Sequence, residues 1–292
     1  MKNPPFIYHR PESLDEALGL LAAHGNDAKV LAGGQSLLPT MALRLGPPEQ
    51  LIDISHIPDL AKISVAPDHS VSIGALVRHA GAERSNDIAR NAPLIHQAMP
   101  HVGHRAIRTR GTVVGSIAHA DPAAEMPAVV LATGATMVAQ SSAGTREIPA
   151  QNFFEGYLTT ALRPDELLTE VRFPEWATTS GGAVVELSRR HGDFAMVGLA
   201  CHIQISADNI EHAALAFFGV GPTPVRVSLV ESQLIGQPPT ADVFAAAAAA
   251  VSATLSPTAD LHGSANYRKH LAGVLTVRGL TAAAAERIGA PA

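Results

Sequence analysis

The chain has 292 residues, of which 47% are hydrophobic and 16% are charged, and its formal net charge is −5 at pH 7. This length suits one large domain or two compact ones, and the apolar fraction excludes a disordered chain. The small negative charge gives no strong attraction to nucleic acid or to an anionic membrane surface. The only cysteine, Cys201, excludes an internal disulfide. It also excludes an iron–sulfur cluster held by this chain alone, which needs about four ligands.

No segment has the composition of a membrane span or of a secretion signal. The apolar stretches at 195–201 and 244–251 are shorter than the roughly 20 residues needed to cross a bilayer. The first residues, Met-Lys-Asn-Pro-Pro-Phe, lack the apolar core of a signal peptide. We therefore expect a soluble, mixed α/β protein of a reducing, cytoplasmic compartment.

The first 55 residues favour alternating strands and helices, which is typical of a partly parallel sheet. Ser13 and Glu16 form a capping-box pattern, and leucines follow it at helical spacing until Gly25. Strands are expected at 6–9, 29–32 and 51–54, and a second helix at 37–45.

The pattern then changes to short strands and helices around a segment at 101–115 that is rich in glycine and arginine. We expect a loop there, and a helix that begins with Asp121 as its cap and Pro122 at its first position. The expected strands lie at 61–65, 71–74, 135–139, 146–148 and 167–173, and the expected helices near 77–83 and 94–99.

A cluster of Pro, Thr, Ser and Gly at 174–182 is the best domain boundary. Beyond it, three long apolar runs with short connections predict an antiparallel meander, followed by helices that are partly rich in alanine. The strands are expected at 184–188, 195–205 and 211–220, and the helices at 225–235, 240–255 and 266–285.

The standard signatures of nucleotide, hydrolase and zinc-protease sites are absent from the sequence. It contains no Gly-x-Gly-x-x-Gly after a strand, no Walker A motif, no nucleophile elbow and no His-Glu-x-x-His. His101 and His104 have a His-x-x-His spacing, but no acidic or cysteine partner follows at ligand spacing. A polar loop lying over a ligand is favoured there over a zinc site.

Two segments are unusual. At 30–38 a buried strand ends in Gly33-Gly34-Gln35-Ser36 before a helix, which is typical of a phosphate cradle, although a plain turn with positive φ would look the same. At 110–122 small residues and hydroxyls precede an acidic residue, which serves either a ribose or ribityl chain or only as a helix cap. Together the two segments predict a site for a long, polar ligand that carries phosphate.

These segments resemble a known family. Ala-Gly-Gly-Gln-Ser-Leu-Leu-Pro at 32–39 resembles the first flavin motif of the FAD-binding medium subunit of molybdenum hydroxylases, the carbon monoxide dehydrogenase and xanthine dehydrogenase type. The segment at 110–125, which ends His-Ala-Asp-Pro-Ala-Ala-Glu, resembles the second motif. Gly156-Tyr157 and the segments at 164–168, 189–195 and 267–271 also resemble the family.

One position departs from the family pattern. Val114 stands where the second motif usually has the first of two glycines. If that position needs positive φ, valine would cost about 1–2 kcal/mol of local strain. The loop would then be slightly displaced or FAD bound more loosely. We expect FAD binding to be retained, because Gly115 and Ser116 still match the motif, and unchanged FAD content and dissociation in a Val114→Gly variant would argue against strain.

The resemblance implies an α+β protein with a FAD-binding domain of the vanillyl-alcohol-oxidase type. Two α/β subdomains, 1–57 and 58–174, would hold FAD between them. A C-terminal domain, 175–292, would add a three-stranded antiparallel sheet and a helical bundle.

The resemblance also implies a set of cofactor-binding residues, with no catalytic acid or base and no metal ligand in this chain. His119, Asp121 and Glu125 would serve the ribose, the ribityl chain or nearby water. Leu162 would border the isoalloxazine, and Phe194 would cover one ring face or be an ordinary core aromatic. Adenine and pyrophosphate would lie along Val30, Leu31, Ala32, Gly33, Gly34, Gln35, Ser36 and Leu37, and along Thr112, Gly115 and Ser116.

By the same resemblance, the chain would be an oxidoreductase subunit that relays electrons. A small subunit would supply them from two [2Fe–2S] clusters, a large molybdopterin subunit would hydroxylate the substrate, and an external acceptor would take them from FAD. A dimer of heterotrimers is implied, in the cytoplasm or peripherally at the inner membrane face, without a nucleic-acid partner. The alternatives are a stand-alone FAD oxidoreductase of the same fold and a scaffolding subunit without flavin.

Overall fold

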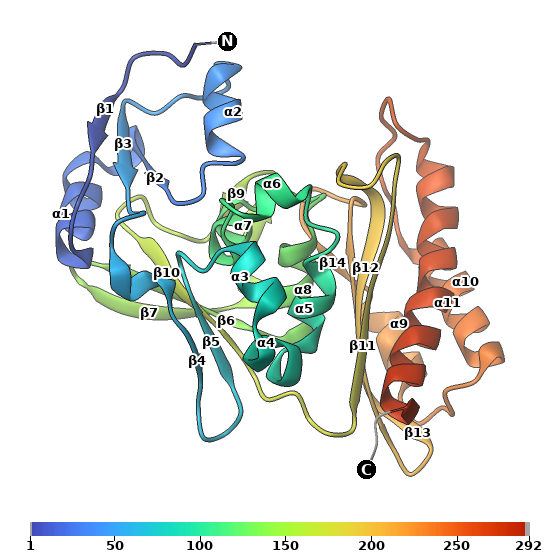
Figure 1. Cartoon of the computed structure of the whole chain (residues 1–292). Coiled ribbons are helices and arrows are strands. Elements are labelled where there is room, and N and C mark those ends of the chain that lie inside the picture. The colour runs from blue at the N-terminus through green and yellow to red at the C-terminus, as the bar shows by residue number, and fades with distance from the viewer. Residues whose placement is uncertain (1, 290–292) are drawn as a thin grey trace.

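The chain begins with a small parallel sheet (Figure 1). We describe a computed structural model that covers residues 2–289. The strand order β1-β3-β2 is all parallel because a helix or helical turn connects each strand to the next. The Ser13 hydroxyl accepts from the Glu16 N–H at 3.2 Å, as predicted, while the Glu16 carboxylate reaches one residue further back, to the Glu12 N–H. The elements are β1 Ile7–His9, α1 Leu14–His24, η1 Gly25–Asp27, β2 Ala28–Leu31, α2 Leu37–Ala42 and β3 Gln50–Asp53.

A five-stranded antiparallel sheet with the order β4-β5-β10-β6-β7 follows. Its strands are β4 Ile63–Val65, β5 Val71–Gly74, β6 Thr136–Ser141, β7 Gly144–Pro149 and β10 Leu167–Phe173. Short helices fill the crossover between β5 and β6: α3 His79–Arg84, α4 Asn86–Asn91, α5 Pro93–Ala98, α6 Arg105–Arg108, α7 Val113–His119 and α8 Glu125–Thr133. The remaining elements are η2 Pro58–Ala61, η3 Ala150–Asn152 and a hairpin of β8 Phe154–Gly156 and β9 Thr159–Thr160.

The C-terminal part is an antiparallel sheet packed on helices (Figure 1). The predicted three strands are present, and a two-residue strand adds a fourth at the edge. The strands are β11 Ser180–Ser188, β12 Ala195–Ser206, β13 Asn209–Phe218 and β14 Val225–Arg226. The helices are α9 Ser228–Leu234, α10 Ala241–Thr254 and α11 Ala265–Gly289.

Strand β12 is buried on both faces, and its side chains divide between two hydrophobic cores with the period of two that a strand imposes. Val197, Leu199, Cys201 and Ile203 belong to the core that includes α10 and α11. Ala200 on the opposite face belongs to the core that includes α8 and the two N-terminal sheets. Because its two faces contribute to different cores, β12 connects the C-terminal sheet to the rest of the molecule.

Two sequence predictions were wrong in the middle of the chain. The segment at 101–115 is not a loop, because α6 and the start of α7 lie within it. The predicted helix start at Asp121-Pro122 is a turn in which the Asp121 carboxylate accepts from the Ala123 N–H at 2.9 Å. Helix α8 begins four residues later, where Pro127 falls in the first turn and its missing N–H breaks no intrahelical bond.

Smaller differences have local causes. The helix expected at 37–45 ends at Ala42, and Arg44 just beyond it adopts a left-handed conformation with φ of 60°. Helix α4 and the β8–β9 hairpin were not predicted. Among residues 2–289, no helix is both long and apolar enough to cross a membrane. The division into units at 57 and 174 stays a prediction.

The strain expected at Val114 is absent. Val114 lies in α7 with helical geometry, and it is 1% exposed. Its φ is not positive. The condition for strain, a positive φ at position 114, is therefore not met, because the backbone here is an ordinary helix that accepts a β-branched residue.

The Val114→Gly variant is accordingly expected to lose stability rather than to relax. Removing a buried side chain and placing glycine in a helix should lower the free energy of unfolding by about 2–3 kcal/mol. Urea unfolding of the full chain would measure this change. An unchanged or higher midpoint would show that position 114 does carry strain.

Candidate functional site

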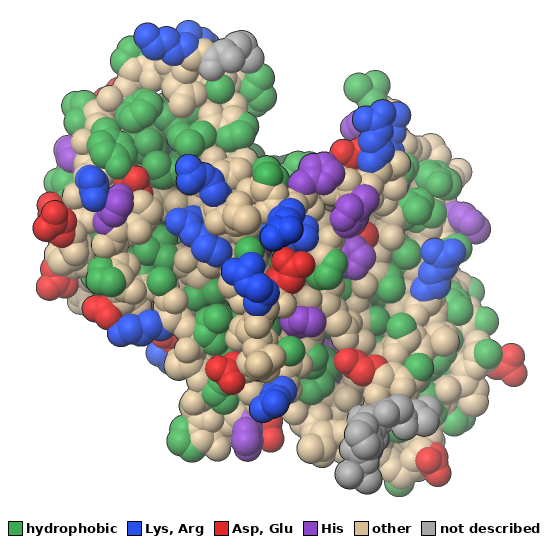
Figure 2. Space-filling view, viewed as in Figure 1, with side chains coloured by type: hydrophobic (Ala, Val, Ile, Leu, Met, Phe, Trp, Pro, Cys, Tyr) green, Lys and Arg blue, Asp and Glu red, His purple; other side chains and the backbone are tan. Residues whose placement is uncertain are grey.

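A cavity of about 790 Å³ lies where four segments of the chain converge. These are the β2–α2 turn, the segment leading into α7 and α8, the β9–β10 connection, and the loop before β12. Figure 2 shows the surface notched along its upper edge, between the N-terminal sheet and the part that carries β11 and β12. All of the predicted site residues except Leu31 line this cavity. Leu31 packs instead against Gly34.

The first predicted loop is held against the second through Gly33. A Cβ at this position would lie 2.7 Å from both the Arg110 carbonyl oxygen and the Gly111 Cα. Gly34, next in the chain, has φ of +72°. The segment is therefore also a turn with positive φ, which was the alternative to a phosphate cradle in the sequence analysis. The Gln35 amide donates to the Gly33 carbonyl at 3.1 Å and fixes the turn. The two glycines thus have different tasks, close approach and left-handed geometry.

The second predicted segment is ordered by Thr112. Its hydroxyl accepts from the Gly115 N–H at 3.1 Å and caps α7, which leaves the hydroxyl hydrogen available to donate. Thr112 is 2% exposed and lines the cavity, as do Gly115 and Ser116. The structure therefore places the hydroxyl and small residues of both loops on one cavity wall.

Three titratable groups of the predicted site follow along the chain. Burial lowers the pKa of His119, and the nearby Asp121 carboxylate partly opposes this shift. Glu125 is 6% exposed, and burial raises its pKa to about 7. The neighbouring Glu186 and Asp121 carboxylates raise the pKa of Glu125 further, while its own backbone N–H and His101 oppose the shift. Glu125 can therefore hold a proton near neutral pH and donate a hydrogen bond into the cavity.

The raised pKa of Glu125 predicts that stability falls as pH rises. The folded protein keeps this proton up to about pH 7, whereas the unfolded chain releases it near pH 4.5. Ionisation therefore favours unfolding, and the free energy of unfolding of the FAD-free chain should drop by about 3 kcal/mol between these values.

Glu125→Gln should remove this part of the pH dependence, and denaturant unfolding at pH 4.5, 6 and 7.5 measures it. Glu211→Gln, at an exposed position on β13, is the matched control and should leave the slope unchanged. An identical slope in wild type and Glu125→Gln would contradict the assignment.

Apolar side chains border the same cavity. Leu162 is half-buried in the wall, and Leu158 is exposed with φ of 51°. Phe194 is 63% exposed, so the alternative of an ordinary core aromatic was wrong for this residue. An exposed aromatic beside a cavity is suited to cover a flat ring system.

His79 was missed by the sequence analysis although it lines the cavity. It begins α3, and its backbone N–H donates to the Gly111 carbonyl at 3.0 Å. The neighbouring Arg78 forms a bridge with Thr112, which brings the start of α3 beneath the second loop. No local signal marks the residue, because the contact joins segments more than 30 residues apart.

The two histidines of the His-x-x-His spacing have separate neighbours. His101 faces a Glu186 carboxylate oxygen at 3.5 Å, which raises the pKa of His101. His104 packs edge-on against His191 with ring centroids 6.4 Å apart. Among residues 2–289, no three His, Cys, Asp or Glu side chains come together in a way that could hold a metal ion.

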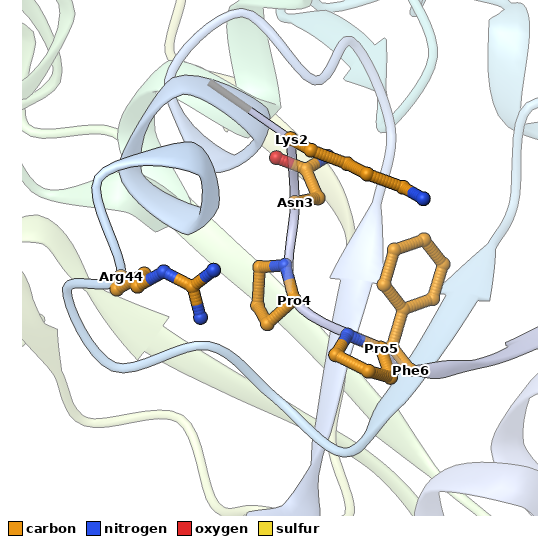
Figure 3. Close-up of a pocket in the computed structure, with 6 residues that line it drawn as sticks. All are labelled: Lys2, Asn3, Pro4, Pro5, Phe6 and Arg44. Atoms are coloured by element: carbon orange, nitrogen blue, oxygen red, sulfur yellow. The ribbon is translucent and has the colours of Figure 1, made fainter.

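A second pocket, of about 730 Å³, lies beside the N-terminal segment (Figure 3). It is lined by Lys2, Asn3, Pro4, Pro5, Phe6 and Arg44, none of which is a predicted site residue. Two basic side chains beside prolines and one aromatic ring offer no constellation for catalysis.

The cavity of the predicted site fits a flavin dinucleotide. Its volume lies in the range of sites that enclose ligands of this size. Hydroxyl and glycine-rich loops suit phosphates and ribose, acidic residues suit hydroxyl groups, and the apolar border suits an isoalloxazine ring. The Thr112 hydroxyl, which accepts from the Gly115 N–H, still has its own hydrogen to donate, so the hydroxyl chemistry of this wall also suits phosphate or ribose oxygens.

Comparisons with known proteins agree with this fit. The family profile described as "FAD binding domain in molybdopterin dehydrogenase" matches residues 4–176, and that of the "CO dehydrogenase flavoprotein C-terminal domain" matches residues 183–283. A 6-hydroxypseudooxynicotine dehydrogenase complex subunit alpha from Paenarthrobacter nicotinovorans is 40% identical over 97% of this chain and 96% of its own length. The carbon monoxide dehydrogenase medium chain from Hydrogenophaga pseudoflava is 39% identical over 96% and 97%.

Solved structures match equally well. Carbon monoxide dehydrogenase from Hydrogenophaga pseudoflava superimposes with a TM-score of 0.95 over 98% of this chain and 99% of the matched chain, at 39% identity. Quinoline 2-oxidoreductase from Pseudomonas putida 86 gives a TM-score of 0.92 over 97% and 98%, at 36% identity. The predicted fold class and family resemblance are therefore confirmed over the whole length. The chain belongs to the family of FAD-binding medium subunits of molybdenum hydroxylases, and it is an oxidoreductase subunit whose cofactor is FAD.

Proposed function

We propose that this chain relays electrons through FAD within a heteromeric molybdenum hydroxylase. Electrons would come from two [2Fe–2S] clusters in a small subunit, and an external acceptor would remove them from the flavin. A large molybdopterin subunit would carry out the hydroxylation. The proposal extends to a dimer of such heterotrimers in the cytoplasm, with peripheral attachment at the inner membrane face as an alternative.

The convergence of the predicted residues on one cavity carries this proposal. The two flavin-motif loops are far apart in the sequence, yet Gly33 and Gly111 bring them into backbone contact. A pocket built in this way serves one long ligand, and Leu158, Leu162 and Phe194 give part of its remaining wall an apolar border. This arrangement supports a chain that binds FAD and leaves the organic substrate to another subunit.

The residues of the cavity divide into three tasks in this proposal. Gly33 to Ser36 and Thr112 to Ser116 would hold the diphosphate and adenosine part, and His119, Asp121 and Glu125 the hydroxyl groups of the ribityl chain or ribose. Leu162 and Phe194 would border the ring and exclude water from its faces. When bound, FAD supplies the ability to accept an electron pair and to release electrons one or two at a time.

Glu125 would act as a hydrogen-bond donor to these hydroxyl groups. Its carboxyl group lies in the cavity wall, and its pKa of about 7 lets it hold or release a proton near neutral pH. Arg78 donates to the Arg110 carbonyl and so fixes the backbone of the second loop. The chain's contribution would thus be binding and orientation of the cofactor.

Relatives of this chain belong to complexes with very different substrates. Their names include 6-hydroxypseudooxynicotine dehydrogenase, caffeine dehydrogenase and carbon monoxide dehydrogenase, at 39–40% identity in each case. The named substrates differ while the sequence identity to this chain stays nearly the same. This supports a role that these subunits share, electron transfer, rather than a role in choosing the substrate.

Co-purification tests the proposal. The tagged chain, expressed in its native host, should bring down a large molybdopterin subunit and a small iron–sulfur subunit, and the preparation should contain about one FAD per chain. Substrate-reduced complex, mixed with NAD, a quinone or oxygen, should then reoxidise fastest with its physiological acceptor. A yellow chain that purifies alone would favour a stand-alone oxidoreductase, and a colourless one that cannot be reconstituted would favour a scaffold.

A further inference from the structure

The His-x-x-His segment at 101–104 contacts the β11–β12 hairpin through both of its histidines. His101 Nδ1 lies 3.5 Å from a carboxylate oxygen of Glu186 on β11. His104 packs edge-on against His191, in the turn of the hairpin, with ring centroids 6.4 Å apart. Figure 2 shows histidine side chains gathered beside the notch in the surface. The connection between α5 and α6 is thus attached to the hairpin at two points.

The turn of this hairpin, at 189–194, is shaped to rest on His104. Gly192 has φ of +86°, which favours glycine, and a Cβ at this position would lie 2.5 Å from the His104 ring. The same turn contributes Gly192, Asp193 and Phe194 to the wall of the FAD cavity. Because the Phe194 ring is mostly exposed, its own packing does little to keep it there. The contact with His104 therefore helps to hold Phe194 at the cavity.

The contact at His101 belongs to a cluster of charged groups that is largely shielded from water. The Glu186 side chain is 6% exposed, and its Oε2 has no hydrogen-bond partner in the part of the chain that the structure describes. Glu125, buried at the start of α8, acts on His101 and is acted on by Glu186. Helix α5 packs on both α8 and β11. The cluster therefore joins the FAD-binding part to the C-terminal sheet, and its charges decide whether it attracts or repels.

Rising pH changes the cluster from attractive to repulsive. The contact with Glu186 raises the pKa of His101 against the opposing effect of burial, and Glu125 raises it further. Burial raises the pKa of Glu125 to about 7, helped by Glu186 and Asp121 and opposed by its own backbone N–H and His101. In mildly acidic solution a protonated His101 therefore faces the Glu186 carboxylate and a neutral Glu125. In alkaline solution His101 is neutral and two carboxylates share a site of low polarity, so the attraction is lost.

We propose that residues 101–104 form a clasp, which holds the β11–β12 turn and Phe194 over the FAD cavity and releases them as the pH rises above neutrality. The inference rests on the proposed placement of FAD in this cavity. It gives the His-x-x-His spacing a role other than metal binding, because His101 holds β11 by charge and His104 supports the turn by shape. Release of the turn would uncover the side of the cavity at which Phe194 lies, and FAD would leave faster in alkaline solution.

The test is the rate of FAD release from the co-purified complex at pH 6, 7 and 8.5, followed by flavin fluorescence after dilution. Wild type should release FAD about fivefold faster at pH 8.5 than at pH 6. Glu186→Gln removes the charge on which both titrations act, so this ratio should fall below about twofold. His101→Gln should release FAD faster than wild type at pH 6, where it lacks the positive charge, and like wild type at pH 8.5.

Two further variants separate the clasp from a general loss of packing. His270→Gln, at an exposed position on α11, is the matched control and should leave the wild-type ratio unchanged. His104→Ala removes the ring on which Gly192 rests, and it should speed FAD release at every pH. Its ratio between pH 8.5 and pH 6 should stay that of wild type, because His101 and Glu186 are still present.

Hydrogen exchange of the FAD-free complex reports on the clasp without the cofactor. After correction for the intrinsic effect of pH on exchange, amides at 189–194 should be less protected at pH 8.5 than at pH 6 in wild type. In Glu186→Gln the protection should be the same at both pH values.

The outcomes separate the two proposals. An unchanged ratio of FAD release in Glu186→Gln would overturn the clasp, and so would protection at 189–194 that does not depend on pH. A wild-type complex that takes up no FAD would overturn the placement of the cofactor, and hydrogen exchange would then still decide for or against the clasp.

Discussion

Replacing Gly33 with alanine should nearly abolish FAD binding. The new methyl group would lie 2.7 Å from the Arg110 carbonyl oxygen and 2.7 Å from the Gly111 Cα. Both are backbone atoms, so no flexible side chain can move aside, and the two loops must separate by several tenths of an ångström. Because the proposed diphosphate site needs both loops in register, the FAD dissociation constant should rise about 100-fold or more.

The measurement is FAD content of the purified complex together with titration of the stripped protein. Gly19→Ala is the control, because a Cβ at this position in α1 meets nothing within 4 Å and alanine favours a helix. This control should retain full FAD and equal or slightly higher stability. Near-wild-type FAD affinity in Gly33→Ala would show that contact between the loops is dispensable for the cofactor.

Local patterns predicted much of the fold because many elements follow their own sequence signals. Residues 71–74 and 167–173 form strands with the bounds expected, and the three long antiparallel strands lie where apolar runs predicted them. In these segments the side chains that define the pattern are the ones that tertiary packing buries. Propensity and packing therefore agree.

The segment at 101–115 shows why other elements could not be predicted from local sequence. Its glycines and arginines favour a loop, but Val113 is fully buried at the start of α7 against neighbouring elements. Arg108 also donates to the carbonyls of Val102 and Gly103, so a charged side chain holds the turn before α6. Such stabilisation comes from contacts across the fold, and no window of local sequence contains it.

The residues of the candidate site also fall into those that local sequence predicts and those that it does not. The two loops were predicted because each carries a compact motif, whereas His79 was missed because its position in the cavity lining depends on a contact with the distant Gly111. The strain considered for Val114 is absent for a related reason. The expectation assumed a glycine-type turn, and the Thr112 cap instead begins a helix there.

The second large effect is expected at Arg268 in α11, which joins the C-terminal helices to the cavity. Its side chain is almost fully buried and donates to the Met196 and Gly219 carbonyls and, at 2.6 Å, to the Asp260 carboxylate. The Gly219 N–H in turn donates to the Pro122 carbonyl at 2.8 Å. One guanidinium therefore holds the start of β12, the end of β13 and, through Gly219, the turn at Asp121-Pro122.

Arg268→Met should lower the free energy of unfolding by about 3–5 kcal/mol, because two buried carbonyls lose their donor. FAD should also bind several-fold more weakly, since Phe194 in the cavity wall lies two residues before Met196. Urea unfolding and FAD titration measure the two effects, and Arg278→Met, at an exposed position on the same helix, should change neither. Lost stability with unchanged FAD affinity would show that the loop before β12 keeps its place without Arg268, and that α11 supports the fold but not the flavin site.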